Sequence, residues 1–271
     1  MNNKNSSNYD QAIKEHYDKV AFDNKDKPSC TMDNDFVRDT ETDFIVDTIK
    51  KYINSEKKDY NLVDVGCGNG YTLDILSKNF TDIKFRGIEQ NDSLRNLADE
   101  KVGKYNINIY SGDIRNEIKI LTEKIDILVC QRVIINLLDK DDQTLALKNI
   151  INCVKDDGLL IFIECFSSGL KALNLAREEF KLSALPPAHH NLYLDDNFFD
   201  TPELIDFDST KKEFLSTHYY VSRVMHPKIL DLTNQEFRRN SEYVKFFSKA
   251  LSPSIGDFSP IKFLSFIKKK I

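Results

Sequence analysis

The sequence lacks the features that mark several specialised classes of protein. Its longest apolar run, Leu159–Ile163, falls far short of the roughly 20 residues that span a bilayer. The first ten residues contain no apolar segment, so we expect neither a secretory signal nor membrane insertion. No dense basic stretch with interleaved aromatic residues occurs, and 38 Lys and Arg stand against 43 Asp and Glu, a net charge of −5. General nucleic-acid binding is therefore not expected.

Cysteine is scarce and has no metal-binding pattern. The five cysteines are odd in number and show no C-x-x-C spacing; they are Cys30, Cys67, Cys130, Cys153 and Cys165. This usage is typical of reduced thiols, so we expect a cytoplasmic protein without disulfides. No group of histidines and carboxylates has ligand spacing in the sequence, so no metal is expected either.

The composition that is present suits a globular α/β chain, with 41% hydrophobic and 30% charged residues in 271 positions. Apolar spacing predicts an amphipathic helix over 36–53. Between residues 60 and 165, short β-rich runs alternate with helical segments, the rhythm of a parallel sheet. The runs predicted as strands are 61–65, 84–89, 107–111, 125–130 and 159–165. Beyond them the pattern predicts a helix over 170–180, a strand over 213–221, a helix over 235–250 and a strand over 261–268.

One glycine-rich loop follows the first predicted strand and precedes a helix. It reads Gly66-Cys67-Gly68-Asn69-Gly70. Glycines permit a tight turn and a close approach of a ligand to the backbone, and a helix N-terminus offers free N–H groups. The position after Gly70 is Tyr71, whereas a dinucleotide fingerprint has Gly or Ala at the corresponding place, so a pyrophosphate ligand is disfavoured.

The segment Asp64–Gly70 resembles the first motif of the class I S-adenosylmethionine-dependent methyltransferases. The resemblance implies that Glu89, with Gln90 beside it, accepts the ribose hydroxyls of S-adenosylmethionine. It implies a Rossmann-like seven-stranded mixed sheet and a cytoplasmic transferase that releases S-adenosylhomocysteine. Further positions in the same order match the family, and an N-terminal cap is implied by Tyr17 and Arg38. The implied cofactor-binding residues are Tyr17, Arg38, Asp64, Gly66, Cys67, Gly68, Gly70, Glu89, Gln90, Gly112, Asp113, Ile114, Cys130, Gln131 and Arg132.

Polar residues after the fifth predicted strand suggest an acceptor site. We predict His190, Glu164 and Tyr219 as catalytic candidates, with His190 as the general base if the acceptor is a hydroxyl. The predicted substrate-binding residues are Asn174, Arg177, His189, Asn191, Tyr220 and Arg223. Their arrangement is similar to bacterial methyltransferases of surface-glycan biosynthesis, which implies O-methylation of a sugar or phosphate-type acceptor in polysaccharide biosynthesis.

Three alternatives stay open at this point. The acceptor atom could be the nitrogen of a small metabolite or antibiotic, or the fold could serve as a non-catalytic module that senses the cofactor or binds a partner. Nucleic-acid methylation is disfavoured, because Cys130-Gln131-Arg132-Val133 stands where a base-flipping motif would follow the fourth strand. The sequence leaves the oligomeric state undetermined.

We expect one domain over residues 1–271. Its parts are an N-terminal cap over 1–55, a cofactor-binding core over 56–165, a substrate lid over 166–225 inserted between strands 5 and 6, and a C-terminal helix and strand over 226–271.

Overall fold

A computed structural model describes residues 7–24, 34–54, 59–116, 123–208, 215–236 and 241–270. Cys30 lies outside these residues. The described strands form a seven-stranded mixed sheet in the order β3-β2-β1-β4-β5-β7-β6. The strands are β1 (Tyr60–Val65), β2 (Ile83–Ile88), β3 (Asn108–Tyr110), β4 (Ile125–Gln131), β5 (Val154–Cys165), β6 (Leu204–Asp206) and β7 (Ile261–Lys268).

The sheet is parallel except at β7. β1 pairs in parallel with β2 and β4, and β4 with β5, whereas β7 lies antiparallel between β5 and β6. Parallel strands covered on both faces need continuous apolar runs. All seven residues of β4 except Gln131 are buried, in agreement with this rule. The predicted seven-stranded α/β fold is therefore confirmed.

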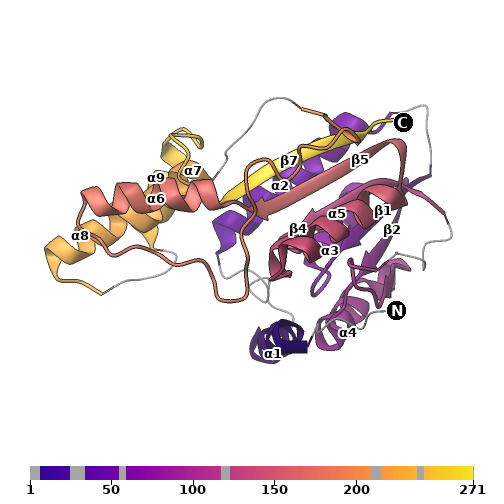
Figure 1. Cartoon of the computed structure of the whole chain (residues 1–271), viewed down its shortest axis with the longest axis horizontal. Helices are drawn as coiled ribbons and strands as arrows, with labels where there is room; N and C mark the ends of the chain where they lie inside the picture. The colour runs from indigo at the N-terminus through magenta and orange to yellow at the C-terminus, as the bar shows by residue number, and fades with distance from the viewer. Residues whose placement is uncertain are drawn as a thin grey trace.

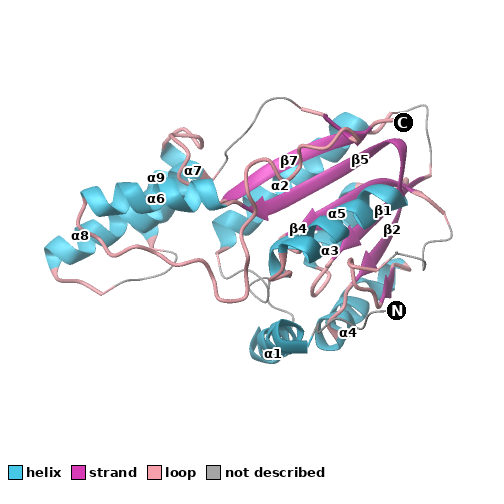
Figure 2. Cartoon of the chain, viewed as in Figure 1, coloured by secondary structure: helices cyan, strands magenta, loops and turns pink. Residues whose placement is uncertain are grey.

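Helices cover both faces of the sheet. The described helices are α1 (Ser7–Asn24), α2 (Asp35–Tyr52), α3 (Tyr71–Asn79), α4 (Asp92–Val102), α5 (Lys140–Cys153), α6 (Ser167–Glu179), α7 (Ser216–Tyr220), α8 (His226–Thr233) and α9 (Glu242–Ala250). In Figure 2, α5 lies in front of the central strands and α2 behind them. The helix expected over 36–53 corresponds to α2, which begins where the Asn34 side chain accepts a hydrogen bond from the Val37 N–H.

Helices α6, α7, α8 and α9 form a helical extension that projects from the end of the sheet (Figure 1). The strand predicted over 213–221 is wrong, because its described part forms α7 and the start of a π-helix over Val221–Met225. The Ser216 hydroxyl bonds the carbonyls of Ile255 and Gly256, and these tertiary contacts outweigh the β preference of the Tyr and Val residues. The sixth strand is instead the short β6, and the helix predicted over 235–250 begins only at Glu242.

The cap helix α1 stands apart from the sheet and beside α4 (Figure 1). Ala21 and Leu94 are buried between these two helices, with Tyr17 packed against them. Asp18 accepts a hydrogen bond from the Asn91 side chain at 2.8 Å. No helix in the described part of the chain is long and apolar enough to cross a membrane.

Candidate functional site

A cavity of about 510 Å³ lies at the carboxyl ends of β1, β2 and β4 and is covered by α1. Ligands of open α/β sheets bind at this edge. Of the fifteen predicted cofactor residues, twelve line the cavity: Tyr17, Arg38, Asp64, Gly66, Cys67, Gly68, Glu89, Gln90, Gly112, Ile114, Gln131 and Arg132. Gly70, Asp113 and Cys130 lie behind this surface and support it.

The glycine loop needs a backbone shape that other residues resist. Gly66 has a φ of 66°, and a Cβ added there would lie 2.4 Å from a methyl carbon of Val133. Both effects exclude a larger residue. The Gly66 N–H donates to the Ile88 carbonyl at 2.7 Å, which ties the loop to the end of β2.

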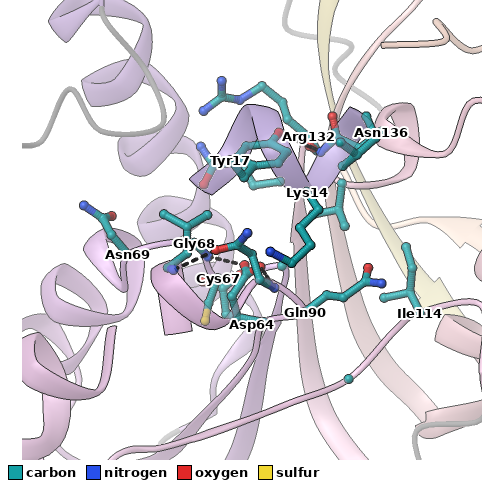
Figure 3. Close-up of a pocket in the computed structure, with 18 of the residues that line it drawn as sticks. Lys14, Tyr17, Asp64, Cys67, Gly68, Asn69, Gln90, Ile114, Arg132 and Asn136 are labelled. Carbon is teal, nitrogen blue, oxygen red and sulfur yellow. Dashed lines mark hydrogen bonds between the residues drawn. The ribbon is translucent and has the colours of Figure 1, made fainter. Parts of the chain in front are cut away.

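Glu89 joins this loop to the next one. One carboxylate oxygen accepts from the Gly68 N–H and the other from the Asn91 N–H, both at 2.8 Å (Figure 3). The side chain is buried, and this burial raises the pKa of Glu89 above its usual value. The backbone N–H of Gln90 also hydrogen-bonds to this carboxylate. Because an ionised carboxylate can accept about four hydrogen bonds, acceptor capacity remains for a ligand.

Asp64 lies on the floor of the cavity at the end of β1 (Figure 3). Only 2% of its surface is exposed. Burial, with a further contribution from the negative charge of Glu89, raises the pKa of Asp64 to about 8. The carboxyl of Asp64 is therefore mostly protonated at neutral pH, and a cationic ligand group beside it would favour its ionised form.

Arginine and polar side chains line the part of the cavity near α2 and the loop after β4. The guanidinium of Arg38 lies 4.4 Å from the centre of the Tyr71 ring, in a cation–π contact. Arg132 directly follows β4 in a left-handed conformation, with a φ of 57°, and pairs with the buried Glu41 at 3.3 Å. The Tyr17 hydroxyl accepts a 2.8 Å hydrogen bond from the Asn136 amide, which ties α1 to the loop after β4 and places Tyr17 beside Arg132 (Figure 3).

An ion-pair network lies where α1 meets the loop after β3 and the start of α5. Arg115 pairs with Asp113 at 2.5 Å, with Asp10 of α1 at 3.0 Å and with Asp142 at 3.3 Å. Tyr9 of α1 also hydrogen-bonds to Asp142. Asp113 thus serves the cavity by orienting Arg115, and Gly112 and Ile114 on either side of Asp113 form the wall.

Comparison with known proteins places this geometry in a family. Residues 62–158 match a family model described as a methyltransferase domain. The N-methyltransferase NodS from Bradyrhizobium japonicum, solved with S-adenosylhomocysteine, is similar over 97% of this chain and 100% of its own, with 14% identity and a TM-score of 0.55. Residues 62–158 therefore carry a methyltransferase domain, and the chain as a whole shares the fold of NodS.

Other solved methyltransferases are similar as well. A putative methyltransferase of Haloferax volcanii, solved with the Trm112 activator, shares 12% identity over 94% of this chain and 98% of its own, with a TM-score of 0.56. CalS10, an amino pentose methyltransferase from Micromonospora echinaspora, is 22% identical, with a TM-score of 0.39. This match covers 45% of this chain and 49% of CalS10, so the chain spans about half the length of that protein. No curated protein sequence matches the chain significantly.

Two of the predicted catalytic residues lie away from the cavity surface. Glu164 is completely buried and accepts hydrogen bonds from the N–H groups of Val133, Ile134 and Ile135. Its burial raises the pKa of Glu164 to about 7, and it holds the loop after β4 from below. Tyr219 packs on the core from α7, where burial raises the pKa of its hydroxyl. Neither residue has the position of a base in contact with an acceptor.

Four predicted substrate-binding residues belong to the helical extension. The Asn174 side chain exchanges two hydrogen bonds with the backbone of Leu185, at 2.8 and 2.9 Å. Arg177 donates to the carbonyls of Ser183 and Arg223. Tyr220 packs against Phe258. The structure therefore brings Asn174, Arg177, Tyr220 and Arg223 together in contacts that stabilise the extension, with none of them on the cavity wall.

The remaining predicted residues form a histidine cluster beside the cap. His190 stacks on His16 with ring centres 3.9 Å apart, and His189 lies edge-on to both rings. Burial lowers the pKa of His190 to about 4. The Asn191 side chain carries a buried oxygen without a hydrogen-bond partner among the described residues. His190 approaches the cavity through Tyr17, with a distance of 6.2 Å between ring centres.

The sequence reasoning missed lining residues on α1, around the glycine loop, at the start of α4 and in the loop after β4. They are Tyr9, Asp10, Gln11, Ile13, Lys14, Asn69, Tyr71, Thr72, Asn91, Asp92, Leu94, Val133, Asn136 and Leu137. Lys14 extends from α1 down toward Gln90 (Figure 3). The amphipathic pattern of α1 was the available signal, but it does not tell which face of the helix covers a ligand.

Proposed function

We propose that this protein transfers the methyl group of S-adenosylmethionine to a small polar acceptor. The observation that carries the proposal is one cavity in which Asp64 with the glycine loop, Glu89 and Arg38 converge from three separate segments. Its volume, about 510 Å³, is in the range of small-molecule sites.

The nucleoside part of the cofactor fits the end of the cavity near β2 and β3. The acceptor capacity left on Glu89 suits the ribose hydroxyls, since a vicinal diol presents O–H donors side by side. Gly112 and Ile114 offer an apolar wall and backbone groups to the adenine. A Cβ at Gly112 would lie 2.7 Å from Ile88, so the wall can come this close only with glycine.

The amino-acid part of the cofactor fits the end near α2. Its carboxylate would pair with the guanidinium of Arg38, and its ammonium group would pair with Asp64. The ammonium favours the ionised form of Asp64, so binding at neutral pH would release a proton from this carboxyl.

The cofactor supplies an electrophilic methyl group on a sulfonium. Transfer then needs an acceptor lone pair in line with the bond that breaks, with water excluded. Tyr17, held by Asn136, covers this region from α1, and Arg132 borders it from β4. In the products, the acceptor holds the methyl group and has lost one proton, and S-adenosylhomocysteine leaves.

The positions of the candidate bases support nitrogen as the acceptor atom. Glu164 is occupied by three backbone N–H groups and Tyr219 is packed in the core. A neutral amine reacts without a base, so these positions favour nitrogen. NodS, similar over the whole chain, is described as an N-methyltransferase. Oxygen is the second candidate, and its support is His190, which is adjacent to Tyr17.

A sugar of a surface-glycan precursor is our proposed acceptor class. The polar rim near Tyr17, Arg132 and Asn136 suits hydroxyl and amino groups. A screen of amino sugars against the corresponding hydroxyl sugars, read as S-adenosylhomocysteine formed, tests both the class and the atom. Formation of S-adenosylhomocysteine only with non-sugar acceptors would overturn the sugar assignment.

Calorimetry with S-adenosylhomocysteine tests cofactor binding itself. We expect one-to-one binding by wild type and loss of at least about tenfold in affinity for Glu89→Ala, since a buried carboxylate paired to a diol is removed. The control is Glu100→Ala, at an exposed position of α4. Absence of binding by wild type would refute the proposal. Binding without methyl transfer to any acceptor would support the non-catalytic alternative.

His190→Ala distinguishes the two acceptor atoms. A mild change in kcat fits an amine, whereas a loss of about 100-fold or more, the range of general-base catalysis, fits a hydroxyl.

A further inference from the structure

Three of the five histidines of the chain meet beside the proposed active site, and methyl transfer to nitrogen as proposed above needs none of them. His16 comes from α1, and His189 and His190 come from the loop between α6 and β6. One ring nitrogen of each residue can be chosen so that all three lie within 4.8 Å of one another. The spacing of these histidines in the sequence does not predict the group, because the three residues meet only when the fold brings α1 against the loop.

The donor set has the chemistry of a transition-metal site. Neutral imidazole is a preferred ligand of zinc and related divalent ions, and three histidines with an open fourth position form a well-known kind of zinc site. The Nδ1 atom of His190 is buried and has no hydrogen-bond partner in the described part of the chain. A buried nitrogen of this kind costs free energy unless a ligand reaches it.

We propose that His16, His189 and His190 bind one divalent transition-metal ion of the zinc type. A tetrahedral site with metal–nitrogen bonds of about 2.0 to 2.1 Å places its donor atoms about 3.4 Å apart. The three nitrogens lie within 4.8 Å of one another, so each distance between two of them must shorten by at most about 1.4 Å when the ion binds. His16 and His190 are stacked at 20°, so at least one of these rings turns about χ2, a torsion with a broad energy well.

The surroundings permit this movement and this charge. His189 is exposed on a loop, and its ring is already edge-on to the other two, at 81° and 83°. The positive charge of Arg132, which acts on His190, is paired with the carboxylate of Glu41 at 3.3 Å. A cation can therefore enter beside His190 without facing an uncompensated guanidinium.

The bound ion would fasten the cap to the loop. His16 lies 5.0 Å from Tyr17, measured between ring centres, and Tyr17 covers the cavity. Because a metal bond links α1 to residues far away in the sequence, we expect the thermal unfolding temperature to rise with zinc. We also expect slower amide exchange in α1.

The test uses the untagged full chain, freed of metal with a chelator, and no activity assay. Calorimetry with Zn²⁺ and absorption with Co²⁺ should give one ion per chain, with d–d bands and no sulfur-to-metal charge-transfer band. His16→Gln, His189→Gln and His190→Gln should each weaken binding by at least about tenfold. His226→Gln, at a histidine stacked on Tyr243, is the matched control and should bind as wild type does.

Three outcomes would overturn the proposal: no one-to-one binding, binding that survives the substitutions, or a thiolate signature that moves the ion to a cysteine. His189 is exposed, so His189→Gln keeps the proposal testable even if the other variants unfold. None of these measurements involves the cofactor or an acceptor, so their failure leaves the proposed methyl transfer untouched.

Discussion

Replacing Asp64 by Asn should stabilise the free protein by an amount that grows with pH. The pKa of Asp64 rises from 3.8 to about 8 on folding, chiefly because burial penalises the charged form. Between these values the unfolded chain has released its proton while the folded chain still holds it, so wild-type stability falls as pH rises. Asn carries no such proton, and its amide matches the carboxyl in size.

The magnitude follows from the shift in pKa. Each pKa unit corresponds to about 1.4 kcal/mol, so the variant gains nothing near pH 4 and up to about 6 kcal/mol above pH 8. Relaxation of the cavity and entry of water reduce this maximum.

Urea denaturation at half-unit steps from pH 4.5 to 9 measures this difference in the free energy of unfolding. Asp47→Asn, at an exposed position of α2, is the control and should leave the pH dependence unchanged. A constant difference between Asp64→Asn and wild type across the series would refute the reasoning. The same variant should bind S-adenosylhomocysteine more weakly, because it cannot become an anion.

The other predictions concern the loop and the cap. Gly66→Ala should lower the free energy of unfolding by about 3 kcal/mol, from the left-handed conformation and the collision with Val133, and Val133→Ala should restore part of this loss in chemical denaturation. Full stability of the single variant would contradict this account. Arg115→Gln should break the ion pairs of Arg115 with Asp10 of α1 and with Asp142, seen as faster amide exchange in α1 with unchanged exchange in β4. Glu164→Gln should destabilise the fold by about 1 to 3 kcal/mol, because its amide N–H cannot accept from all three backbone N–H groups; equal melting temperatures would argue against it.

The sequence determined the sheet and the cofactor side of the site. Apolar runs such as β4 fit only a covered parallel strand, and the order of strand, glycine loop and helix is local information. Residues at the carboxyl ends of parallel strands share one edge, so the amino-acid sequence alone predicts that Asp64, Glu89 and Gln131 lie close together.

Only the tertiary structure decided the acceptor side. Residues 216–220 became helix because the loop around Gly256 supplies partners that no local pattern reveals. Glu164 looked like a base at a strand end, but the loop after β4 folds over it and uses both carboxylate oxygens. His16 and His190 are distant in the chain, and their contact depends on how α1 packs against α4 and the loop. Local propensity fixes elements, whereas contacts between distant segments depend on the packing of the whole molecule.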